Sequence, residues 1–103
     1  MRFLKEMYVS EGVKNKQKVM WKLKCGVGML DIYVISLSNG NDQLDCMNCC
    51  YFKQKAVRDS VGTIVGLAKG YSEAQQLMIA MIEEAIRETG SANVKEYLAN
   101  TKQ

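Results

Sequence analysis

Four cysteines are the residues whose spacing most resembles a chemical site. Cys46 and Cys49 have the C-x-x-C spacing that can chelate a metal or exchange disulfides, and Cys50 follows directly. On a helix these three thiols would share one face, and Cys25 could add a fourth from a strand. The set is therefore a candidate zinc, iron or redox site.

Other features of the sequence favour a packing role for these thiols. The chain has no histidine and no second C-x-x-C pair, and structural zinc sites usually take ligand pairs from loops. Cysteine also fills small apolar gaps between a helix and a sheet. We favour that role, keep metal binding and redox chemistry as alternatives, and expect no cofactor. The lack of histidine also excludes Ser–His and Cys–His pairs, so we do not expect an enzyme.

Lysines are concentrated near the start of the chain. Residues 1–24 contain seven basic and two acidic residues, whereas the whole chain has a net charge of only +3. Apolar residues and lysines alternate over residues 18–25, which predicts a strand with Trp21 facing inward. The lysines of this strand and the preceding loop form a stripe that could contact nucleic-acid phosphates: Lys14, Lys16, Lys18, Lys22 and Lys24. A solvated strand that avoids aggregation is the alternative that we favour.

Two further positions suggest binding surfaces. Lys69 lies in a glycine-containing turn before a helix, where free N–H groups could hold an anion, although the spacing does not match a phosphate-binding loop. A tight turn capped by Ser72 is the simpler interpretation. Ile79 interrupts the polar face of the helix expected after this turn. It therefore indicates a partner surface, with a second copy of the chain as the simplest partner.

These residues must be positioned by elements that the pattern also predicts. We expect the order β-β-β-α-β-α-α, with strands and helices over residues 2–9, 18–25, 31–37, 43–58, 62–68, 72–89 and 91–101. Asp42 would cap the helix over 43–58, and a right-handed crossover would pair the strands 31–37 and 62–68 in parallel. The sequence thus predicts one α+β domain over residues 1–103. It would have a mixed sheet of about four strands with helices mainly on one face.

Composition places this domain among ordinary globular proteins. Hydrophobic residues make up 48% of the 103 residues and charged residues 24%, which suits a single core. The start of the chain lacks a secretory pattern, and the apolar runs are far shorter than a membrane span. We therefore expect a cytoplasmic protein without membrane insertion.

Three stretches give a resemblance to known proteins. Asp31–Leu37, Phe52–Lys55 and Val65–Ala74 are similar to segments of small bacterial α+β domain proteins of unknown function. The resemblance covers residues 31 to 98 and implies a bacterial cytosolic setting, but no activity and no site residues.

The function that these observations favour is a small non-catalytic binding or interaction module. It would act as a homodimer or dock a protein partner through Ile79. Two alternatives stay open, a cysteine-dependent metal or redox protein and a nucleic-acid-binding module that uses the lysine stripe.

Overall fold

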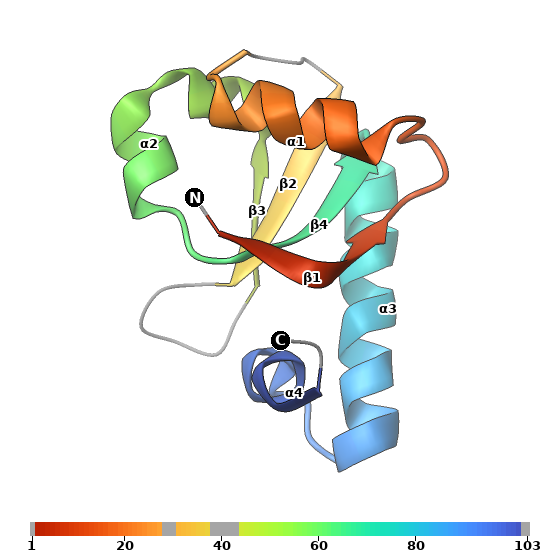
Figure 1. Ribbon diagram of the computed structural model, residues 1–103. Helices are drawn as coiled ribbons and strands as arrows, with labels where there is room; N and C mark the ends of the chain where they lie inside the picture. The colour runs from red at the N-terminus through yellow and green to blue at the C-terminus, as the bar shows by residue number, and fades with distance from the viewer. Residues whose placement is uncertain (1, 28–30, 38–43, 102–103) are drawn as a thin grey trace.

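The computed structural model describes residues 2–27, 31–37 and 44–101 (Figure 1). The elements in chain order are β1 (Phe3–Val9), α1 (Lys16–Lys24), β2 (Ile32–Leu37), β3 (Leu44–Asn48), the 3-10 helix η1 (Cys49–Lys53), α2 (Lys55–Ser60), β4 (Ile64–Lys69), α3 (Tyr71–Thr89) and α4 (Val94–Thr101). No helix in the described ranges is long and apolar enough to cross a membrane.

The four strands form one mixed sheet in the order β1-β4-β2-β3, which confirms the α+β class. β1 is parallel to β4, whereas β2 is antiparallel to both β4 and β3. The predicted parallel pairing of the strands 31–37 and 62–68 is therefore wrong. The reason is that the chain reverses direction in β3 before η1 and α2 lead it to β4. β4 therefore runs antiparallel to β2.

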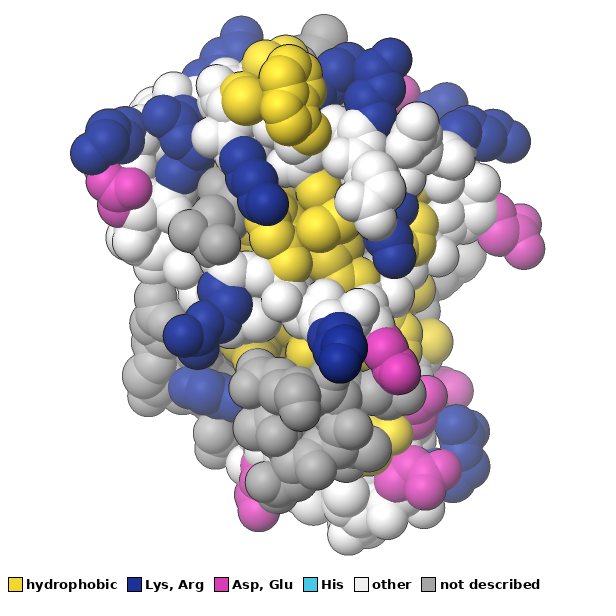
Figure 2. All heavy atoms as spheres, viewed as in Figure 1, with side chains coloured by type: hydrophobic (Ala, Val, Ile, Leu, Met, Phe, Trp, Pro, Cys, Tyr) yellow, Lys and Arg dark blue, Asp and Glu magenta, His cyan; other side chains and the backbone are white. Residues whose placement is uncertain are grey.

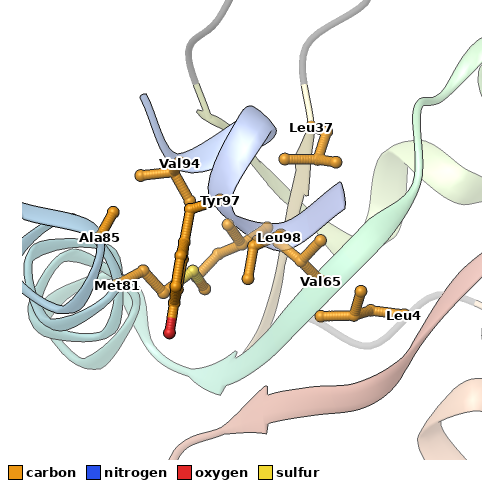
Figure 3. Close-up of a cluster of buried hydrophobic side chains, with 9 residues drawn as sticks. Leu4, Leu37, Val65, Met81, Ala85, Val94, Tyr97 and Leu98 are labelled. Atoms are coloured by element: carbon orange, nitrogen blue, oxygen red, sulfur yellow. The ribbon is translucent and has the colours of Figure 1, made fainter. Parts of the chain in front are cut away.

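Helices pack on both faces of this sheet rather than mainly on one. On one face, α3 and α4 bury Met81 and Leu98 against the sheet, and Figure 3 shows this core. On the other face, α1 and η1 bury Leu23 and Phe52 in a second core. Each face of the sheet is apolar because Val34 and Ile35 alternate between the two cores, and both are at most 1% exposed.

The predicted strand over residues 18–25 is wrong, because this segment is the helix α1. The side chain of Asn15 caps its start by accepting a hydrogen bond from the Lys18 N–H at 3.1 Å. At its end, Gly26 is left-handed with φ 75°, and its N–H and that of Val27 donate to carbonyls of the last turn. The alternation of apolar residues and lysines over residues 18–25 is compatible with a helix as well as with a strand. In the helix, Val19 and Leu23 face inward and Trp21 faces solvent.

The predicted helix over residues 43–58 is wrong in its first part, whereas its second part is helical as η1 and α2. Its first part is the strand β3, whose Cys46 and Met47 pair with Ile35 and Val34 of β2. The Asn48 side chain then accepts a hydrogen bond from the Cys50 N–H at 2.8 Å, which ends the strand and starts η1. The expected cap at Asp42 lies outside the described residues.

The remaining elements are confirmed. β1, β2, β4, α3 and α4 fall on the segments that the pattern assigned to strands and helices. α3 begins directly after Gly70 and has no side-chain cap, so the expected capping role of Ser72 is wrong. Gly90 ends α3 in the left-handed region, as its place after Thr89 predicts.

Gly26 and Gly90 allow a matched test of how α1 is held. Both have φ near +75° (75° and 77°), but a Cβ at Gly26 would collide with the Arg58 guanidinium, whereas a Cβ at Gly90 meets nothing within 4 Å. Gly90→Ala should therefore cost only the backbone strain, about 1 kcal/mol of the free energy of unfolding. Gly26→Ala should cost about 1 kcal/mol or more beyond that, since Arg58 must give up hydrogen bonds. Urea unfolding of both variants measures the difference, and equal losses would contradict this role of Arg58.

Candidate functional site

Four of the five lysines of the predicted stripe lie on the helix α1, and Lys14 precedes it. We call the set Lys14, Lys16, Lys18, Trp21, Lys22 and Lys24 the basic face. The helix has no acidic residue, and its last turn carries two of the lysines, where the helix dipole favours positive charge. Figure 2 shows Lys and Arg side chains gathered where α1 lies, around a protruding hydrophobic group. The residues are those predicted, although a helix rather than a strand presents them.

Trp21 is the residue of this surface that the sequence analysis placed wrongly. Its side chain is 61% exposed rather than buried, and it is the chain's only tryptophan. On a helix the positions three residues away are neighbours, so Lys18 and Lys24 occupy the positions next to Trp21. The capping residues Asn15 and Gly26 are the signals that could have revealed the helix and hence this orientation.

Lys24 is held by contact with a neighbouring strand. Its ammonium lies 5.3 Å from the centre of the Phe3 ring, which is a cation–π geometry. The lysine therefore lies over β1 while its charge stays at the surface, since the side chain is exposed.

A second group of cations continues the basic face onto η1 and α2, which lie on the same side of the sheet as α1 (Figure 1). Tyr51 of η1 is 58% exposed, and Lys53 follows it. Lys55 is paired with Asp59 at 3.2 Å. Arg58 has a structural role, because its Nη1 donates to the carbonyls of Phe52 at 2.6 Å and Lys53 at 3.0 Å.

Lys69 does not belong to the basic face. It lies at the end of β4 with its ammonium 3.9 Å from Asp31. The anion held beside this turn is the protein's own Glu73, which accepts hydrogen bonds from the Ser10 hydroxyl at 2.5 Å and the Gly12 N–H at 3.3 Å. The hydrogen bond from Ser10 is the main cause that lowers the pKa of Glu73 below its ordinary value. These hydrogen bonds join the start of α3 to the segment after β1, and their donors lie outside the turn in which the anion cradle was predicted.

A cavity of about 490 Å³ lies beside this carboxylate, between the end of β1 and α3. Its lining includes Glu11, Gln76 and Leu77 as well as Glu73. Two carboxylates give this cavity a sign opposite to that of the basic face, so the two surfaces cannot share an anionic ligand.

The structure separates the four cysteines. Cys25 is exposed at the end of α1, and Cys46 packs against the core under α3 and α4. Cys49 is fully buried in the core on the other face, and Cys50 is half-buried. Within the described residues, no three Cys, Asp or Glu side chains are placed to hold a metal ion. The geometry that suggested metal or redox chemistry depended on one helix that carries Cys46, Cys49 and Cys50, but Cys46 lies on the strand β3 and the other two lie on η1.

These positions predict how the four thiols react with an aromatic disulfide reagent. Cys25 should react fastest because it is exposed, and Cys49 should react only on unfolding because it is buried. Cys46 should be slow, since burial raises the pKa of its thiol. Time-resolved thiol titration of the native and the urea-unfolded protein measures this order. Four equally fast thiols, or one equivalent of tightly bound zinc, would contradict it.

Ile79 lies on the solvent side of α3, on the face of the sheet opposite to α1. It is 55% exposed, and Ile86, two helical turns further along, is 47% exposed. The predicted partner residue is therefore part of a short apolar stripe, and this stripe is separate from the basic face.

Comparison with known proteins gives no family and no neighbour. No family model, no curated protein and no solved structure matches the chain.

Proposed function

We propose that this protein is a nucleic-acid-binding module and that the basic face is its binding surface. The observation that carries the proposal is a short, carboxylate-free helix that presents lysines around one exposed tryptophan. Lysines bind phosphates mainly as point charges, so affinity comes from replacing counterions along the nucleic-acid backbone. The module needs no catalytic group.

The rigid attachment of α1 supports this role. Val19 and Leu23 anchor the helix in the core, so the lysines extend from a fixed support rather than from a loop. Fixed cations lose less conformational entropy on binding than cations on a mobile segment. The same support makes the surface suitable for mutational tests, because the lysines can change without a change in the core.

Charge reversal at Lys18 is the sharpest test of the proposal. Lys18 is exposed in the first turn of α1, where a negative charge favours the helix, so Lys18→Glu should not weaken the fold. We expect a short oligonucleotide to quench the emission of Trp21 and the variant to bind it about tenfold more weakly, as roughly 1.4 kcal/mol would give. With five lysine contacts, the logarithm of affinity should fall with the logarithm of salt at a slope of roughly −3.5 to −4.5.

Arg87→Glu is the matched control for this titration. It changes the net charge by the same amount, but Arg87 is exposed on α3, on the other side of the sheet. Its affinity should equal that of the unmodified protein. Equal loss in both variants would show that only the net charge matters, and no quenching at low salt would refute the proposal.

Association of two copies through α3 is a second candidate, favoured by the exposed isoleucines of this helix. Ile79 and Ile86 lie seven residues apart, which places them on one helix face, and Ile82 between them is half-buried. Contact between two such stripes would bury apolar side chains that are otherwise in water.

Ile79→Lys tests the second candidate. If two copies associate through this stripe, sedimentation should show a dimer for the unmodified protein and a monomer for the variant, since a buried lysine without a partner is costly. Cys25→Ser, on the other side of the sheet, should leave the dimer intact. A monomer at all concentrations would contradict association through α3.

A cytoplasmic, bacterial setting is also part of this proposal. None of the four cysteines forms a disulfide, as expected in a reducing compartment, and this supports the cytoplasmic part of the setting.

A further inference from the structure

Resting on the proposed function, we infer that the nucleic acid bound by the basic face is single-stranded, with unpaired bases stacking on Trp21 and Tyr51. These are the two large exposed aromatic rings on this side of the sheet, at 61% and 58% exposure. Tyr71 is also exposed, but it begins α3 and its ring packs against Tyr33 with centroids 5.6 Å apart. Among the described residues, no such aromatic neighbour covers Trp21 or Tyr51.

The two rings lie on elements that are fastened together. α1 and η1 are neighbours, and Leu23 and Phe52 share the same core with no exposure. The Arg58 guanidinium joins them from the side, because it binds the carbonyl of Phe52 and lies against Gly26. The two rings therefore extend from segments whose backbones are held relative to each other, rather than from independent loops.

Cations lie on the elements that carry both rings. Lys18 and Lys24 are each about one helical turn from Trp21, and Lys53 is exposed at the end of the short helix that carries Tyr51. Alternation of aromatic rings with cations matches a single strand, in which each nucleotide offers a phosphate and an exposed base face. A duplex offers the same phosphates, but its base faces are already stacked and cannot reach a protein ring.

A substitution at Tyr51 distinguishes the contribution of base stacking to the affinity from the contribution of charge. Tyr51→Ala removes an aromatic face without changing the charge, and it leaves Trp21 as the fluorescent reporter. Stacking contributes about 1–3 kcal/mol per base, so the variant should bind a 15-nucleotide oligothymidylate roughly 5- to 150-fold more weakly. Its affinity for a 15-base-pair duplex should not change. Tyr71→Ala, on the other side of the sheet, should leave both affinities unchanged.

The experiment measures fluorescence titrations with oligothymidylate, the duplex and an abasic strand of equal length, each at two salt concentrations. We expect the single strand to bind at least tenfold more tightly than either of the other two. Equal binding of all three, with no effect of Tyr51→Ala, would overturn the inference and leave the proposed function standing. No binding of any of them would refute the proposed function itself. If polyglutamate bound as tightly as oligothymidylate, both would be overturned in favour of an acidic protein partner.

Discussion

The attachment of α1 to η1 and α2 is the constraint on which the rest of the account depends. Three contacts meet there: Leu23 and Phe52 in one core, Arg58 bound to the Phe52 carbonyl, and the Cys49 thiol 3.9 Å from the Val27 carbonyl. Because Gly26 is left-handed and has no side chain, the chain can turn under the guanidinium. This join closes one face of the sheet and fixes the direction in which the basic face points.

The two faces of the sheet carry different charge. On the side of α1, lysines surround exposed aromatic rings, whereas the side of α3 carries Glu73 and an apolar stripe with Ile79. The charged form of Glu73 is stabilised by hydrogen bonds from Ser10 and Gly12 rather than by the lysines of α1. A polarised charge distribution of this kind directs an anionic ligand to one side and leaves the other side available for association.

Much of the fold could be predicted because local sequence patterns specify it. The rest could not, because it depends on contacts between segments that are distant in the sequence. The strand β2 and the helix α3 follow from an apolar run and from a 3.6-residue period. β3 forms because it pairs with β2, and no local sequence pattern predicts that pairing. The predicted helix face shared by Cys46, Cys49 and Cys50 therefore does not exist. The lysines of the basic face were identified from charge alone, but Trp21 was missed. Its alternation with lysines fits a strand as well as a helix, and only the capping residues Asn15 and Gly26 separate the two.

The most direct test of the central claim is a map of backbone amide shifts in the ¹H–¹⁵N spectrum as oligothymidylate is added at low salt. The account predicts that shifts concentrate at residues 14–26 and 51–58, weaken as salt is raised and leave α3 unchanged. Shifts centred on α3, or no shifts at any concentration of the strand, would contradict the claim that the basic face binds nucleic acid.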